Sequence, residues 1–244
     1  MRTEQSLKLL TEQITVSDVT VDVLRKNIKS IRLAIYPTGK IRISVPRRVP
    51  DDTIRSFIMS KLQWIKKHQS KQKNQKRLPP KEYKNMESHF FLGNTYVLNV
   101  IETNAPPNII LRSATDIDLY VRPNSSIAVR KAIMNEWYRT ELKKLIPPLI
   151  EYWEKKMHVT VGEWHVKLMK TKWGTCNTQM KRIWINLELA KKPLHLLEYI
   201  IVHEMVHLLE RHHNHKFRAY MQTFLPNWKQ LKAELNKHPI DQRA

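Results

Sequence analysis

The chain has 244 residues, of which 41% are hydrophobic, enough for a sizeable core in one domain or in a domain with an appendage. Its single cysteine, Cys176, excludes an internal disulfide and a thiolate-rich zinc site, and it fits a reducing, cytoplasmic setting. The 43 Lys and Arg against 22 Asp and Glu leave a net charge of +21, which favours polyanionic partners such as nucleic acid or nucleotides.

The N-terminal part predicts a short β-rich region with one helix. Its first residues, MRTEQSLKLLTEQ, hold no signal-peptide core, and no run in the chain approaches the ~18 apolar residues of a membrane span, so we expect no membrane partner. Apolar residues alternate over 31–35 and 41–45 around Thr38-Gly39, which predicts a β-hairpin. Asp51 and Asp52 predict the start of an amphipathic helix that ends in the basic stretch KKHQSKQKNQKRLPPK.

The middle of the chain predicts a sheet followed by a long helical pattern. Short strand-like runs between Phe90 and Val121 favour an antiparallel sheet. An amphipathic pattern then runs from Ser125 or Ser126 to Trp153, and we expect Pro147-Pro148 to split it into two consecutive helices.

The last part predicts an α+β core. Strand patterns occupy 159–173 and 181–189, Pro193 opens a helix, and a final helix is expected from about Asn214 to Asn236. We therefore divide the chain into an N-terminal β-rich region with a basic helix, 1–123, and a core of residues 124–244.

The stretch VHEMVHLLERHHNHKF contains five of the eleven histidines, and within it His203, Glu204 and His207 form an H-E-x-x-H motif. The four-residue spacing sets both imidazoles on one helical face, where they can bind one divalent ion. Glu204 points about 100° away and can reach a metal-bound water, as a general base does. The helix from Leu194 to Leu209 is apolar nearly all round, which indicates burial and makes a cation beside the carboxylate a natural compensation.

A catalytic zinc site takes three protein ligands, so a third must follow His207. Glu210 lies about 10 Å further along the helix than His203 and would strain the geometry. Asn214 favours a turn that carries His212 and His213, whereas His215 falls in the next helix. Spacing alone favours His213 and leaves His212 and His215 as alternatives.

Several segments resemble the YgjP-like family of metal-dependent hydrolases, relatives of the SprT-like and WLM zincin peptidases. They are KTKWGTC, INLELA, Pro193 and HEMVHLLERHHNHKF, together with the upstream IRLAIYPTGKIRISVPRRVP and LQWIKKH. The resemblance implies a zincin-like core, with the H-E-x-x-H helix packed on an antiparallel sheet, a zinc ion and hydrolytic activity. It also implies that the third ligand belongs to an H-x-x-x-F pattern, here His213 and Phe217.

The leading hypothesis is a zinc metallopeptidase acting on protein or peptide. Zinc held by His203, His207 and His213 would lower the pKa of its water, and Glu204 would take the proton. A second hypothesis is a metal-dependent nucleoside triphosphate pyrophosphohydrolase, an activity also linked to YgjP-like proteins, with Lys170, Lys172 and Arg182 on the phosphates. A third is a DNA-associated protease or nucleic-acid-binding module that docks through Lys61 to Lys84. The sequence leaves the oligomeric state open.

Three further expectations concern the neighbourhood of the motif. Gly174 is expected at a turn or bulge, and Cys176 as a small buried residue. The strand Ile183 to Leu189 is expected either as an edge that binds an extended peptide or as a core strand.

Overall fold

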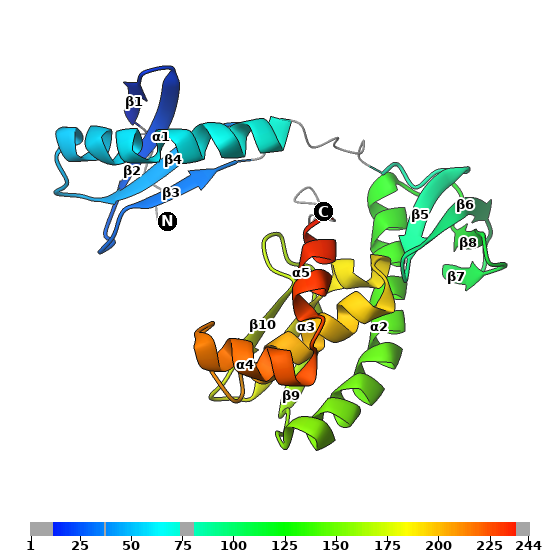
Figure 1. Ribbon diagram of the computed structural model, residues 1–244. Coiled ribbons are helices and arrows are strands. Elements are labelled where there is room, and N and C mark those ends of the chain that lie inside the picture. The colour runs from blue at the N-terminus through cyan, green and yellow to red at the C-terminus, as the bar shows by residue number, and fades with distance from the viewer. Residues whose placement is uncertain (1–11, 37, 74–80, 238–244) are drawn as a thin grey trace, which may run out of the picture. The chain divides into compact units, whose positions relative to one another are not determined.

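The computed structural model describes residues 12–36, 38–73 and 81–237 (Figure 1). The chain forms two compact units, Met1–Pro79 and Pro80–Ala244. The first unit contains β1 (Glu12–Val16), β2 (Val19–Lys26), β3 (Arg32–Ile35), β4 (Ile41–Pro46) and α1 (Asp51–Lys73). The second contains β5 (Glu87–Phe91), β6 (Asn94–Glu102), β7 (Asn108–Leu111), β8 (Asp116–Val121), α2 (Ile127–Met157), β9 (Glu163–Lys167), β10 (Gly174–Asn177), β11 (Arg182–Asn186), a 3₁₀ helix (Leu187–Lys191), α3 (Leu194–Val206), α4 (His215–Phe224) and α5 (Trp228–Lys237).

In the first unit, one helix packs on one four-stranded sheet. The strand order is β1-β2-β4-β3, with β2 and β4 parallel and the outer pairs antiparallel. Gly39, in the β3–β4 turn, has φ +83, a left-handed conformation that glycine adopts without strain. Ile54, Ile58 and Ile65 of α1 are completely buried in the core of this unit. The predicted hairpin and amphipathic helix are thus confirmed; of the basic stretch 61–84, residues 74–80 lie outside the described residues.

The second unit begins with a mixed sheet of order β5-β6-β8-β7. Its central pair, β6 and β8, is parallel, so the prediction of an antiparallel sheet is wrong there. The reason is that β7 pairs antiparallel with the outer side of β8 and does not lie between β6 and β8. Strand β8 therefore runs in the same direction as β6.

This sheet belongs to the second unit, and the two units accordingly divide at Pro79–Pro80 and not near residue 124 as we expected. The hydroxyl of Tyr138 in α2 donates to the Phe90 carbonyl at 2.8 Å, and the Leu92 amide donates to the Ala190 carbonyl at 2.8 Å. Side chains of this sheet, including Leu98 and Leu119, share one hydrophobic core with α2 and α3.

Helix α2 is continuous, whereas two consecutive helices were predicted. Pro147 and Pro148 lie inside it and remove the amide donors that would bond the carbonyls of Lys143 and Lys144. Both lysines are exposed, so water can solvate those carbonyls. Buried side chains such as Ile146 and others on both sides of the prolines keep the helix against the core.

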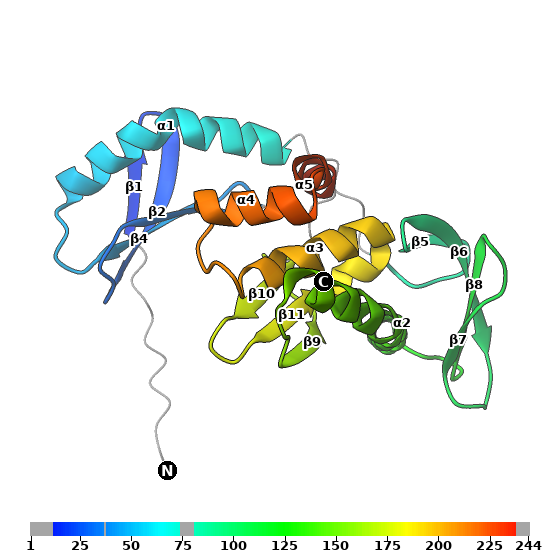
Figure 2. The same ribbon diagram turned by 60° about the horizontal axis from the view of Figure 1, so that its bottom comes forward.

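A second, three-stranded sheet of order β10-β11-β9 supports the histidine helix. β10 and β11 are antiparallel, while β11 and β9 are parallel, so this sheet is mixed and not antiparallel throughout. Helix α3 contacts α2, α4, α5, β10 and β11, which makes it the central helix of the unit (Figure 2). The α+β class is confirmed, and α3, which carries His203 and Glu204 and ends just before His207, contacts β10 and β11.

The C-terminal helical region contains two helices, α4 and α5, in place of the single helix predicted over 214–236. Pro226 follows Leu225, whose φ of −133 and ψ of 84 leave the helical region, as the residue before a proline commonly does. None of the helices in the described part of the chain has the length and apolar character needed to cross a lipid bilayer.

Candidate metal centre

The C-terminal end of α3 carries the first two imidazoles. Nine of its residues are buried, as its all-round apolar sequence predicts, so the helix that carries the two half-buried rings is held in the core. His203 lies in the last turn and His207 caps the helix end, with φ −63 and ψ −21. Because they are one turn apart, their ring centroids lie 5.2 Å from each other.

The turn between α3 and α4 brings a third imidazole, His213, to the same place. Asn214 caps α4 by accepting a hydrogen bond from the Phe217 amide at 3.1 Å, which fixes the chain just after His213. The Nε2 atom of His213 lies 3.0 Å from the Nε2 atom of His203, and its ring centroid is 4.7 Å from that of His207.

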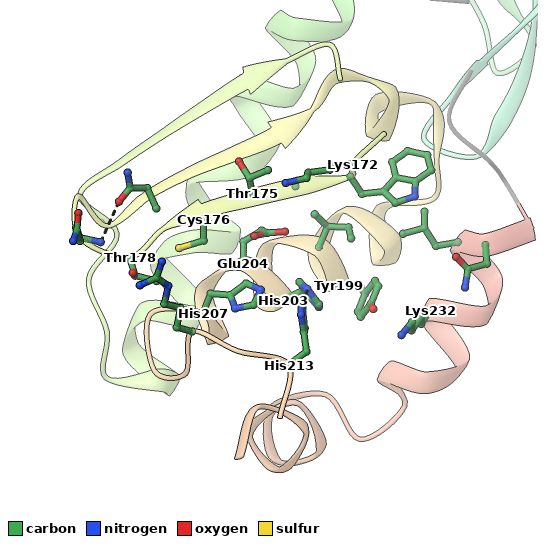
Figure 3. A pocket seen from close by; sticks show the side chains of 18 residues that line it. Lys172, Thr175, Cys176, Thr178, Tyr199, His203, Glu204, His207, His213 and Lys232 are labelled. Carbon is green, nitrogen blue, oxygen red and sulfur yellow. Dashed lines mark hydrogen bonds between the residues drawn. The ribbon is translucent and has the colours of Figure 1, made fainter. Parts of the chain in front are cut away.

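The three rings present a donor set that fits one metal ion. One ligand atom from each of His203, His207 and His213 lies within 4.8 Å of the other two (Figure 3). Zn–N bonds of about 2.0–2.1 Å place two ligand nitrogens of a tetrahedral site roughly 3.3–3.4 Å apart, close to the 3.0 Å between Nε2 of His203 and Nε2 of His213. Neither His212 nor His215 belongs to this group among the described residues.

The Phe217 ring packs against all three imidazoles. Its ring centroid lies 5.0 Å from that of His203, 4.8 Å from that of His207 and 4.6 Å from that of His213. The phenylalanine side chain itself is 3% exposed. One apolar ring therefore fixes the relative positions of three groups that come from two different segments.

The surroundings keep these imidazoles neutral, the form that can donate a lone pair to a metal. Burial, reinforced by the neighbouring histidines and Lys232, lowers the pKa of His203 to about 3. Burial also lowers the pKa of His207 and of His213. His207 Nδ1 lies 3.2 Å from the Glu210 carbonyl oxygen, which can only accept, so Nδ1 carries the proton and Nε2 is free.

Glu204 lies between these rings and strand β10 (Figure 3). It is 5% exposed, and burial raises its pKa to about 8, against the opposing effect of the Lys172 ammonium. A Cβ atom at Gly174 would lie 2.6 Å from Glu204 Oε1. Gly174 is thus the first residue of a strand that passes directly against the carboxylate, and not the turn or bulge that we predicted.

A cleft of about 760 Å³ opens over this arrangement, between β10 and the ends of α3 and α5. All four residues of β10 line it, among them Cys176, which is half-buried and whose thiol pKa burial raises to about 11. β10 is the edge strand of its sheet. The strand that we considered as an edge, β11, is instead central, and residues 187–191 form a 3₁₀ helix.

The charged residues of the cleft differ in part from those expected. Lys172 lines it, whereas Arg182 pairs with Glu163 at 2.8 Å and Lys170 is not among the lining residues. Two further cations, Arg211 and Lys232, line the cleft and were not foreseen from the sequence. No local sequence pattern predicts that Lys232 lies at the cleft, because its position depends on the turn at Pro226 between α4 and α5.

Tyr199 is another lining residue that sequence reasoning did not single out. It precedes His203 by one helical turn, and their ring centroids are 6.1 Å apart. That four-residue spacing could have indicated that Tyr199 lies on the same helical face as His203. Burial raises the pKa of Tyr199 to about 12, so its hydroxyl keeps its proton at neutral pH.

Comparison with known proteins identifies the family of the chain. The family model described as YgjP-like, metallopeptidase domain matches residues 29–238. The chain is also similar to a crystal structure of the metallopeptidase zymogen of Methanocaldococcus jannaschii jannalysin, with 19% sequence identity and a TM-score of 0.33. That match covers 37% of this chain and 92% of the other chain. No curated protein matches the sequence. The match over residues 29–238 spans most of the chain, which therefore belongs to the YgjP-like metallopeptidase family of metal-dependent, peptidase-type hydrolases.

Proposed function

We propose that this metal-dependent peptidase is a zinc enzyme in which His203, His207 and His213 hold the ion and Glu204 acts as general base. The observation that carries the proposal is the convergence of three imidazole nitrogens within 4.8 Å, beside a buried carboxylate. The donor set is entirely nitrogen, and three protein ligands leave one position for water or substrate, the arrangement of catalytic zinc sites.

A zinc ion bound here would lower the pKa of a water molecule and polarise the substrate carbonyl. The remaining chemistry belongs to the residues of the chain. Burial raises the pKa of Glu204, and a cation bound beside it would favour the ionised carboxylate, the form that can accept the proton of the attacking water. It can then donate that proton to the leaving amine.

Strand β10 supports a peptide substrate in our proposal. It forms the edge of its sheet, and all four of its residues line the cleft. An extended peptide can add to such an edge through main-chain hydrogen bonds. Because Gly174 contacts Glu204, a peptide bound there would lie close to the general base.

The decisive experiment combines elemental analysis with an assay on an unfolded protein such as casein. Wild-type protein should contain about one equivalent of zinc, and His213→Ala should lose it. Glu204→Gln should keep the metal and lose turnover by several orders of magnitude, because it cannot accept a proton. Unchanged hydrolysis by Glu204→Gln would refute the role of Glu204.

A second candidate is phosphoanhydride hydrolysis at the same centre. It is favoured by three cations that line the cleft, Lys172, Arg211 and Lys232, because such side chains can hold phosphates. Incubating the protein in parallel with casein and with UTP or ATP separates the two reactions. Release of pyrophosphate without any peptide cleavage would replace the peptidase proposal.

A further inference from the structure

A second hollow, of about 530 Å³, lies at the free edge of β9. It is lined by Arg139 and Lys143 from α2, by Trp164, His165 and Val166 from β9, and by Trp184 from β11. No carboxylate lines it, and it shares no lining residue with the cleft of the metal centre. Figure 2 shows α2 beside the β9–β11 sheet.

Flat aromatic groups form much of this surface. Trp184 pairs in register with His165, so both side chains lie on the same face of the sheet, with centroids 4.6 Å apart and planes tilted by 33°. Trp164 precedes His165 and therefore reaches the hollow from the other face, around the β9 edge. Both tryptophans are only half-buried, which leaves indole surface open to a ligand.

Positive charge surrounds the indoles. The ammonium of Lys167 lies 5.7 Å from the centroid of the Trp184 ring. Neither Lys167 nor Lys143 takes part in an ion pair within residues 12–36, 38–73 and 81–237, although both are exposed. They are the cations here that remain available to an anionic ligand.

The nearby carboxylates are already neutralised by arginines. Glu136 lies 3.1 Å from Arg139 Nε, and the Glu163 carboxylate lies 2.8 Å from Arg182 Nε and 3.4 Å from His165. Arg139 is further fixed by its hydrogen bond to the Val166 carbonyl at 2.7 Å, which ties α2 to the β9 edge. The hollow is therefore a rigid, cationic and aromatic surface.

We propose that this hollow binds single-stranded nucleic acid, with a base stacked on Trp184 and the adjoining phosphates held by Lys143 and Lys167. Stacking platforms interleaved with cations are the general means of binding unpaired strands without sequence preference. An acidic peptide would satisfy the lysines but would leave the indole surface unused. The site lies apart from the metal centre, so it would place the enzyme on a nucleic acid and take no part in hydrolysis.

The test measures binding of a fluorescein-labelled 12-nucleotide oligo(dT) to the full-length protein by anisotropy, at several salt concentrations. Trp184→Ala, which changes no charge, should weaken binding by about fivefold or more, and Trp184→Phe should restore most of it. Lys143→Glu should also weaken binding and should reduce the salt dependence. A matched control is Lys155→Glu, an exposed lysine of the same helix about 18 Å away along its axis, which should have a much smaller effect.

An abasic strand of the same length separates stacking from charge. It should bind wild-type protein at least about fivefold more weakly than oligo(dT) does, and it should bind Trp184→Ala as oligo(dT) does. The proposal is overturned if oligo(dT) and the abasic strand bind equally, if polyglutamate competes as well as oligo(dT), or if Lys155→Glu matches Lys143→Glu. If Trp184→Ala does not fold, the comparison of Lys143→Glu with Lys155→Glu and the binding of the abasic strand to wild-type protein still test the proposal. Glu204→Gln should bind oligo(dT) normally, which keeps this test independent of the proposed catalysis.

Discussion

Gly174→Ala tests the packing of strand β10 against the general base. The added methyl carbon would lie 2.6 Å from Glu204 Oε1, 2.7 Å from its Cγ and 2.9 Å from its Cδ. Carbon atoms in contact prefer separations of about 3.5 Å, so the carboxylate would have to move by roughly 0.6–0.8 Å. Glu204 is 5% exposed and has little free space. A misplacement of about 1 Å can reduce catalysis on the order of 100-fold, and overpacking costs ~1–3 kcal/mol of unfolding free energy.

The assay is casein hydrolysis together with urea unfolding and zinc content, measured over a double-mutant cycle with Glu204→Ala. Gly174→Ala should reduce turnover by about 100-fold while metal content stays unchanged, because the three atoms nearest to the added methyl group all belong to Glu204 and not to an imidazole. In the Glu204→Ala background, where the methyl has room, Gly174→Ala should destabilise by less than about 0.5 kcal/mol. Full activity of Gly174→Ala, or equal destabilisation in both backgrounds, would show that the packing of β10 does not position the Glu204 carboxylate.

Three further predictions concern the histidine turn and α2. His213→Ala should lose zinc in elemental analysis, while His212→Ala should keep it, because only His213 lies with the other two imidazoles; equal losses would contradict the ligand assignment. Phe217→Ala should lower the free energy of unfolding by ~3–5 kcal/mol in urea and weaken zinc retention, since all three rings rest on it; unaltered stability would exclude this supporting role. Pro148→Ala should raise the melting temperature in calorimetry, because it restores a donor for the Lys144 carbonyl in a helix that is already continuous; a lower value would mean that packing of α2 requires the proline.

Features that depend on local spacing could be predicted from the order of the amino acids. The apolar positions of α1 and the turn at Gly39 follow from helical and strand periodicity, and both elements are observed. Spacing also indicated most of the candidate metal centre, although it favoured His213 without excluding His212 and His215. His203 and His207 are one helical turn apart, and Asn214 is a local helix signal that leaves His213 in the preceding turn.

Contacts between segments that are distant in the chain could not be predicted in this way and are seen only in the folded protein. Which strands pair depends on the burial of side chains across the whole unit. The sequence of each strand therefore did not indicate that β6 pairs parallel with β8, or β9 with β11. The same packing keeps α2 helical through two prolines and brings Lys232 of α5 to the cleft. It also sets Gly174 against Glu204. Short-range periodicity is encoded residue by residue, whereas these contacts exist only because a shared hydrophobic core stabilises elements that are far apart in the chain.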